Sequence, residues 1–248
     1  EKVEGFDVVF VIAGLGGGTG GGAGPRVAEM ARSTGALTVS VVSLPFLAEG
    51  PLKQEKAKVS LERFYKSSDT VIVLDNNVLL KIVPNLPILK AFSIMDTLIS
   101  DIINNIAETV NKPSMMRIDF ADLSRLMKKG GASTIMYGEG ELRNLRYVID
   151  ETLNNKFYNV DHTTAKGALI HITGGPDLSL NAMNLIIENL TEGLDSNAEI
   201  KVGTRIREDM MNRVSITAIF TNIEGAYGRK KVSLVKEGAL MDVDSIYP

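Results

Sequence analysis

The chain has 248 residues with a net charge of −3, and 44% of its residues are hydrophobic. It contains no cysteine, which excludes disulfides and thiolate metal sites. This is the composition of an ordinary globular protein with one large or two moderate domains. The near-neutral charge predicts no nucleic-acid partner, and no apolar run reaches the length of a membrane span. With no signal peptide visible, we expect a cytoplasmic protein.

The first part of the chain alternates short apolar runs with amphipathic segments. Runs rich in β-branched residues predict strands at Val8–Ala13, Leu37–Leu44 and Thr70–Leu74. Apolar residues at helical spacing predict helices at Pro25–Ser33 and Gln54–Tyr65. Strands alternating with helices predict an α/β fold built on a parallel sheet.

One long helix is predicted from Ile88 to about Val110, where a wide apolar stripe that includes Leu89 and Phe92 indicates burial on more than one side. Lys112-Pro113 ends it. The elements expected beyond it alternate again: a helix after Asp119, a strand at Ala132–Tyr137, a helix at Glu141–Leu153, a strand at Ala168–Thr173, a helix at Leu180–Leu190, and strands at Glu199–Thr204 and Val214–Thr221. We therefore predict a first domain over residues 1–87, a connecting helix over 88–112, a second α/β or α+β domain over 113–227, and a tail over 228–248.

A glycine-rich run, GGGTGGGAGP over residues 16–25, separates the first strand from the first helix. Without side chains, backbone N–H groups can approach a phosphate closely, and the helix N-terminus adds partial positive charge. The run is not a P-loop, because no Gly-Lys-Ser/Thr ends it. A dinucleotide-binding pattern is disfavoured, because the next strand ends in Pro45-Phe46 instead of an acid. A purely structural turn, packing helix on sheet, stays open.

The run also resembles the signature of the tubulin/FtsZ superfamily, which reads GGGTGTGAAP in FtsZ. A second segment, AKGALIHITGG over residues 165–175, resembles the family's GARGVLVNITGG. The resemblance covers roughly residues 3 to 227. It implies GTP or GDP as cofactor, with Mg²⁺, and a phosphate cradle formed by Gly16, Gly17, Gly18, Thr19 and Gly20.

Asp119 and Asp122 are spaced so that both carboxylates project from one side of a first helical turn. By itself, this spacing is equally typical of a helix start, where an aspartate caps the first turn. The surrounding RIDFADLSRLM resembles the family's NVDFADVRTVM, whose acids enter the nucleotide site of the next subunit and position water and cation. The resemblance therefore implies that Asp119 and Asp122 are catalytic. Arg117 stands where the family has asparagine, which bears on the rate.

The resemblance assigns further contacts to the nucleotide. Glu49 matches a glutamate that contacts the ribose, and Lys53 stands in place of an arginine beside it. Asn76 matches an asparagine near the sugar and base, Phe92 a phenylalanine at the base, and Asp96 an asparagine there. A carboxylate at Asp96 would accept from guanine N1–H and the 2-amino group, which adenine does not present together. Two plainer alternatives stay open: an exposed loop acid for Glu49 and a core position for Phe92.

The resemblance predicts a cytoskeletal GTPase that polymerises head to tail and hydrolyses GTP between subunits. Residues 75–87 look most like the archaeal CetZ branch, which is linked to cell shape. No GGxGxN turn is present, so we expect the first part of the nucleotide domain to be missing here. Two alternatives remain: a nucleotide-binding filament with little hydrolysis, and a dinucleotide-binding enzyme. His162 and His171 are interpreted as structural, since no second ligand stands at metal spacing.

Overall fold

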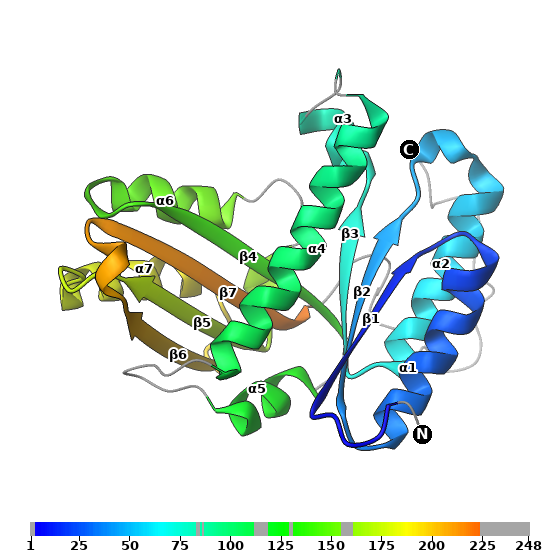
Figure 1. Ribbon diagram of the computed structural model, residues 1–248, viewed down its shortest axis with the longest axis horizontal. Helices are drawn as coiled ribbons and strands as arrows, with labels where there is room; N and C mark the ends of the chain where they lie inside the picture. The colour runs from blue at the N-terminus through cyan, green and yellow to red at the C-terminus, as the bar shows by residue number, and fades with distance from the viewer. Residues whose placement is uncertain are drawn as a thin grey trace, which may run out of the picture.

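A computed structural model of the chain describes residues 3–82, 85, 87–111, 119–128, 131–154 and 161–223. These residues form one seven-stranded sheet in the order β1-β2-β3-β4-β7-β5-β6 (Figure 1). The strands are β1 Val8–Gly14, β2 Leu37–Leu44, β3 Thr70–Asp75, β4 Ala132–Glu141, β5 Gly167–Gly174, β6 Glu199–Ile206 and β7 Arg213–Ile223. The helices are α1 Gly24–Ser33, α2 Pro51–Ser67, α3 Asn77–Ile82, α4 Ile88–Asn111, α5 Phe120–Met127, α6 Leu145–Leu153 and α7 Leu180–Thr191.

The first half of the sheet is parallel, as the sequence predicts. Helices α1 and α2 cover one face, where Phe64 is fully buried, and α4 lies toward the other face (Figure 1). Strand β2 is buried along its first six residues, which explains its unbroken apolar and small-residue run. The parallel arrangement brings the carboxyl ends of β1, β2 and β3 to one edge of the sheet.

The second half of the sheet is mixed. Strand β7 runs antiparallel to both β4 and β5, and β5 runs parallel to β6. The two halves are joined where β3 pairs with β4 through Val71–Ala132 and Ile72–Ser133. Sequence patterns did not predict this junction, because the two strands are separated by the whole of α4 and α5.

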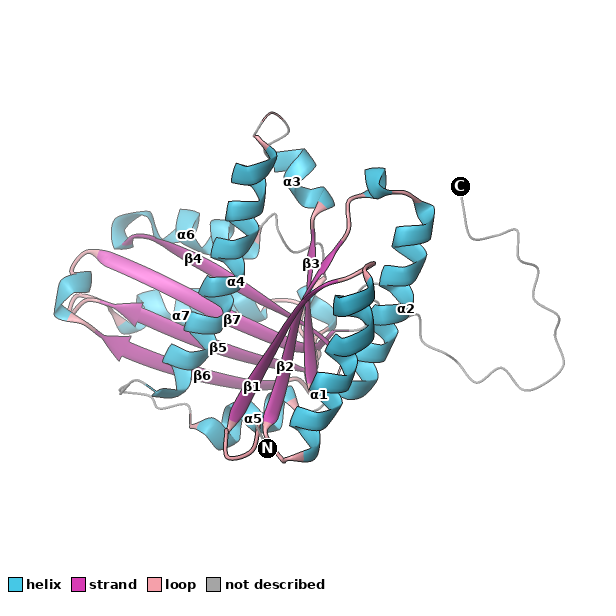
Figure 2. Ribbon diagram, turned by 45° about the vertical axis from the view of Figure 1, so that its right-hand side comes forward, coloured by secondary structure: helices cyan, strands magenta, loops and turns pink. Residues whose placement is uncertain are grey.

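Helix α4 connects the two ends of the molecule. Figures 1 and 2 show α3 beside the start of α4 and α5 at its far end. The 24 residues of α4 span about 36 Å. Its apolar stripe packs against the sheet through residues such as Ile102 and Ile106. The first turns differ from the prediction, because Leu89 and Phe92 are 79% and 42% exposed.

Two local predictions need correction. Helix α3 was not expected; the Asp75 carboxylate starts it by accepting the Asn77 N–H at 2.9 Å. Glu141 does not open a helix, because it pairs with Arg213 as the last residue of β4, and α6 follows only at Leu145. Among the described residues, no helix has the length and apolarity that crossing a membrane requires.

Candidate functional site

The loops that follow β1, β2 and β3 meet at the carboxyl edge of the parallel half-sheet, close to α3 (Figure 1). In open α/β sheets, ligands bind outside this edge, where the loops leave successive strands. The glycine run follows β1, Glu49 follows β2, and Asn76 follows β3. The structure thus brings together three segments that the sequence proposed separately.

Several glycines of the run are required by the fold. Gly16 has a φ of +92°, and a Cβ there would lie 2.7 Å from Lys53 Cγ. A Cβ on Gly20 would lie 2.1 Å from the Gly14 carbonyl oxygen, and one on Gly21 would lie 2.2 Å from Ser60 Oγ. The structural interpretation of the run is therefore correct for these positions.

Gly18 has no such requirement. Its φ of −72° and ψ of −46° suit any residue, and a Cβ on Gly17 or Gly18 would meet nothing within 4 Å. Gly18 caps a five-residue π-helical turn, Thr19–Ala23, that leads into α1, and π turns are frequent at functional sites. The exposed backbone of residues 17–19 therefore has the open space that close approach of an anion needs.

Glu49 and Lys53 lie beside this cradle. Glu49 Oε1 accepts the Phe46 N–H at 2.8 Å, and its Oε2 forms an ion pair with Lys53. The hydrogen bond from Lys53 lowers the pKa of Glu49, so its carboxylate stays ionised as an acceptor. Because the Lys53 side chain also passes over Gly16, it links the β2 loop to the glycine run.

Asn76 supplies an unused polar atom at the same edge. The residue is 9% exposed, and its buried Oδ1 has no hydrogen-bond partner within the described part of the chain. Its neighbour Asn77 joins the loops, since Asn77 Oδ1 accepts the Leu47 N–H at 2.8 Å. A buried polar atom without a partner is costly, so Asn76 fits a site that a polar ligand completes.

The start of α4 contributes an exposed aromatic ring and a carboxylate. The Phe92 ring lies 6.1 Å from that of Phe46 in an edge arrangement, and its exposure shows that it is not a core residue. Asp96 is exposed one turn further along the same side of the helix. The pair thus presents one stacking surface and one acceptor.

The acidic pair lies elsewhere. Asp119 caps α5, with its Oδ1 accepting the Asp122 N–H at 2.7 Å, so the helix-start interpretation is correct. Asp122 contacts Lys201 at 3.0 Å and Arg125 at 3.1 Å. The hydrogen bond from Lys201, together with the charges of Lys201 and Arg125, lowers the pKa of Asp122. Arg117 lies outside the described residues.

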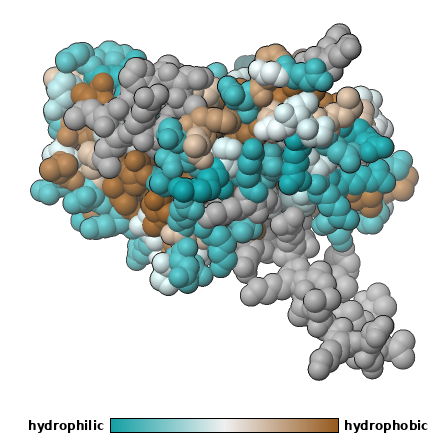
Figure 3. Space-filling view, turned by 90° about the horizontal axis from the view of Figure 1, so that it is seen from below, coloured by the Kyte–Doolittle hydropathy of each residue, from teal (hydrophilic) through white to brown (hydrophobic). Residues whose placement is uncertain are grey.

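The α5 end and the cradle are at opposite ends of α4 (Figures 1 and 2). Seen from the α5 end, hydrophilic side chains cover much of the described surface, with hydrophobic patches among them (Figure 3). Because the two lie at opposite ends of α4, a single copy of the chain does not bring Asp119 and Asp122 to the glycine run.

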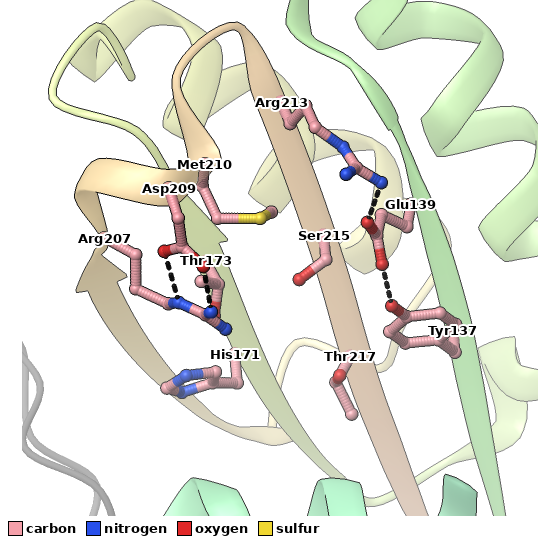
Figure 4. Close-up of a pocket in the computed structure, with 10 residues that line it drawn as sticks. All are labelled: Tyr137, Glu139, His171, Thr173, Arg207, Asp209, Met210, Arg213, Ser215 and Thr217. Atoms are coloured by element: carbon pink, nitrogen blue, oxygen red, sulfur yellow. Dashed lines mark hydrogen bonds and ion pairs between the residues drawn. The ribbon is translucent and has the colours of Figure 1, made fainter.

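Sequence reasoning missed a second, polar pocket of about 270 Å³ over β4, β5 and β7 (Figure 4). Its charged groups pair with one another: Arg207 with Asp209, and Arg213 with Glu139. Of its lining residues, the sequence had singled out only His171, as structural. Because its ion pairs are internal, the pocket indicates no particular ligand charge. In the part of the chain that the structure describes, no group of three or more His, Asp or Glu side chains could hold a metal ion.

Two family models match the chain. The model described as Tubulin/FtsZ family, GTPase domain matches residues 1–84, and the FtsZ family, C-terminal domain matches residues 131–224. A solved FtsZ dimer from M. jannaschii is 35% identical with a TM-score of 0.80, covering 96% of this chain and 72% of that one. The chain belongs to the tubulin/FtsZ superfamily.

Curated relatives agree with this membership. A cell division protein FtsZ 2 from Halobacterium salinarum is 42% identical over 99% of this tubulin/FtsZ chain and 63% of its own length. Another FtsZ 2, from Methanocaldococcus jannaschii, is 44% identical over 90% of the chain and 60% of its own length. The chain thus spans between 60% and 63% of the length of these two relatives.

CetZ structures share the fold. CetZ2 from Haloferax volcanii, solved as a GTPγS-bound protofilament, is 19% identical with a TM-score of 0.73, covering 88% of this chain and 66% of that one. At this identity the likeness shows the fold alone, so membership of the CetZ branch stays a prediction.

Proposed function

We propose that this tubulin/FtsZ chain is part of a cytoplasmic GTPase that assembles head to tail and hydrolyses GTP between subunits, in cell division or cell shape. One observation carries the proposal: the cradle and the acidic pair lie at opposite ends of α4. Head-to-tail stacking puts the α5 end of one copy on the cradle of the next. Such a heterologous contact builds open filaments. The solved FtsZ relative, itself a dimer, supports self-association.

The cradle residues fit a guanine nucleotide. Backbone N–H groups of Gly17, Gly18 and Thr19 would hold the phosphates in the open space beside them. Glu49 and Asn76 would accept from the sugar, with the buried Asn76 Oδ1 gaining the partner it lacks. Phe92 would stack on the base and Asp96 would accept its two donors. Bound GTP would supply the phosphoanhydride bond that is cleaved, and Mg²⁺ would offset the phosphate charge.

The acidic pair would act on the attacking water. Asp119 is held by its capping bond and Asp122 by two cations, so both carboxylates have defined positions on the first turn of α5. Ionised carboxylates there would accept hydrogen bonds from water and orient it toward the phosphate of the neighbouring subunit. Phosphoryl transfer depends mainly on such positioning and on electrostatics, so misplacing either acid would slow hydrolysis.

Mixing two inactive variants of the full-length protein tests the shared site. Gly18→Val fills the cradle of one variant, and Asp122→Ala removes the acid of the other. We expect neither variant alone to release phosphate from GTP. An equal mixture should recover up to about a quarter of the wild-type rate, because that fraction of contacts joins an intact cradle to an intact acid.

Wild-type phosphate release should also rise above a threshold protein concentration. If the mixture releases no phosphate while the wild-type protein does, the proposal of a site shared between subunits is overturned. Nucleotide binding and filaments without phosphate release, in the wild type itself, would favour a nucleotide-dependent filament without catalysis.

A further inference from the structure

Lys201 on the edge strand β6 reaches the acidic pair from a distant part of the chain. Its Nζ lies 3.0 Å from Asp122 Oδ1. Arg125, one turn after Asp122 on α5, lies 3.1 Å from the same oxygen. Both cations thus converge on one atom of the carboxylate.

The network continues on β6. Arg125 also contacts Glu199 Oε1 at 2.6 Å, and Glu199 and Lys201 project from the same face of β6 because they are two residues apart. The first turn of α5 is therefore joined to the edge strand by two parallel links, Asp122–Lys201 and Arg125–Glu199. The side chain of Asp122 is only 24% exposed, so it is partly shielded from water.

We infer that Lys201 is a positioning residue for Asp122: its contact, shared with Arg125, fixes the orientation in which the Asp122 carboxylate meets the nucleotide of the neighbouring subunit. The inference rests on the proposed function. Contact with Oδ1 from both cations restricts rotation of the carboxylate and directs the second oxygen away from them. The capping bond from the Asp122 N–H to Asp119 fixes the backbone of the same residue.

The charge of Lys201 supports the same role. From β6, Asp122 faces Lys201, and Glu199 lies beyond Arg125. From its own helix, Asp122 faces Arg125 and the cap residue Asp119. The bond from Lys201 lowers the pKa of Asp122, which keeps the acid ionised at mildly acid pH. Removing Lys201 should therefore loosen the carboxylate and let it bind a proton at higher pH.

The test compares variants of the full-length protein by phosphate release from GTP, with sedimentation to measure assembled protein. We expect Lys201→Gln to lower kcat per assembled subunit by about tenfold, with little change in KM. The acid limb of its pH–rate profile should move to higher pH. Lys201→Arg, which can still donate to the carboxylate, should restore most of the rate.

Lys166→Gln is the matched control. Lys166 forms a comparable surface pair with Asp195 at 3.2 Å, and its side chain is 38% exposed against 34% for Lys201. We expect this variant to keep the wild-type rate and pH profile. Circular dichroism would check that each variant is folded.

The outcomes separate the two ideas. If Asp122→Asn is inactive while Lys201→Gln behaves like Lys166→Gln, the positioning role is overturned and the shared site stands. The role is also overturned if Lys201→Gln reduces assembly alone, with kcat per assembled subunit unchanged. If Asp122→Asn hydrolyses GTP at the wild-type rate, both proposals are overturned together.

Discussion

The two ends of α4 position their chemistry in different ways. At the cradle end, each contributing loop follows a strand of the parallel half-sheet. Lys53 and Asn77 join neighbouring segments there, and Phe46 contacts Phe92 on α4. At the α5 end, Asp119 is held by its capping bond to the Asp122 N–H, and Asp122 is held by a lysine from β6, nearly eighty residues away in the chain. The first site is therefore fixed by the topology of the sheet, and the second by side-chain ion pairs.

This difference has a consequence for mutation. Changes at the cradle end should affect stability as well as binding, because some glycines there are packed against backbone. Changes at the α5 end should affect the rate with little effect on stability, because exposed ion pairs contribute at most about 1 kcal/mol to folding.

The largest effect should come from Gly20→Ala. Its Cβ would lie 2.1 Å from the Gly14 carbonyl oxygen, so the turn must shift, and we expect unfolding free energy to fall by about 3 kcal/mol. Gly18→Ala should leave stability within about 1 kcal/mol of wild type, since its conformation suits alanine, but should weaken GTP binding. Urea unfolding and nucleotide titration measure both. Equal destabilisation by the two variants would make Gly18 structural.

Asp119→Asn should come next and affect only the rate. Asparagine caps a helix as well as aspartate, so α5 and the stability should be preserved. Loss of the charge should lower GTP hydrolysis by about 100-fold, equivalent to about 2.7 kcal/mol. Steady-state kinetics beside thermal unfolding measure both quantities. Hydrolysis at the normal rate would reduce Asp119 to a helix cap.

Asp96→Ala should have a smaller effect, on base selectivity. A carboxylate can accept from both guanine donors, whereas alanine offers no acceptor, so GTP affinity should fall by about tenfold. Inosine triphosphate lacks the 2-amino group, and its affinity should fall less. Competition binding with the two nucleotides measures the ratio. An unchanged ratio would remove Asp96 from the base site.

The smallest effect should come from His162, which belongs to neither end. Its ring packs against that of Phe220 at a tilt, with ring centroids 4.9 Å apart, and burial lowers its pKa. Its contribution to stability is therefore complete above the ordinary histidine pKa of about 6.5 and is lost as the pH falls below it. His162→Phe should make the urea concentration at the unfolding midpoint less dependent on pH between about pH 7.5 and 5.5. If the slope persists, another group causes it. The same measurement shows whether a loss of GTP hydrolysis at acid pH is caused by unfolding.

The sequence predicted most of the fold because its signals are local. The apolar run of β2, Pro25 at the start of α1 and Asp119 at the start of α5 act within a few residues of each element. Helix α3 was missed because its start depends on a single Asp75 side chain.

The candidate site was only partly visible in the sequence. Family resemblance indicated Asp122, but sequence patterns could not identify the residue that holds it. Lys201 has no distinguishing signal in the sequence, and only the folded sheet brings it beside α5. The glycine run looked uniform in sequence. Only the packing around Gly20 and the open space around Gly18 divide it into structural and binding positions.

The length of α4 bears on the spacing of subunits in a filament. If the site is completed between copies, successive subunits must be separated by at least the distance between the cradle and α5, which α4 spans over about 36 Å. A filament of this protein should therefore show an axial period no shorter than this, and diffraction from filament images would measure it. In such a filament, the length of one helix would set a lower limit on the axial spacing of the subunits.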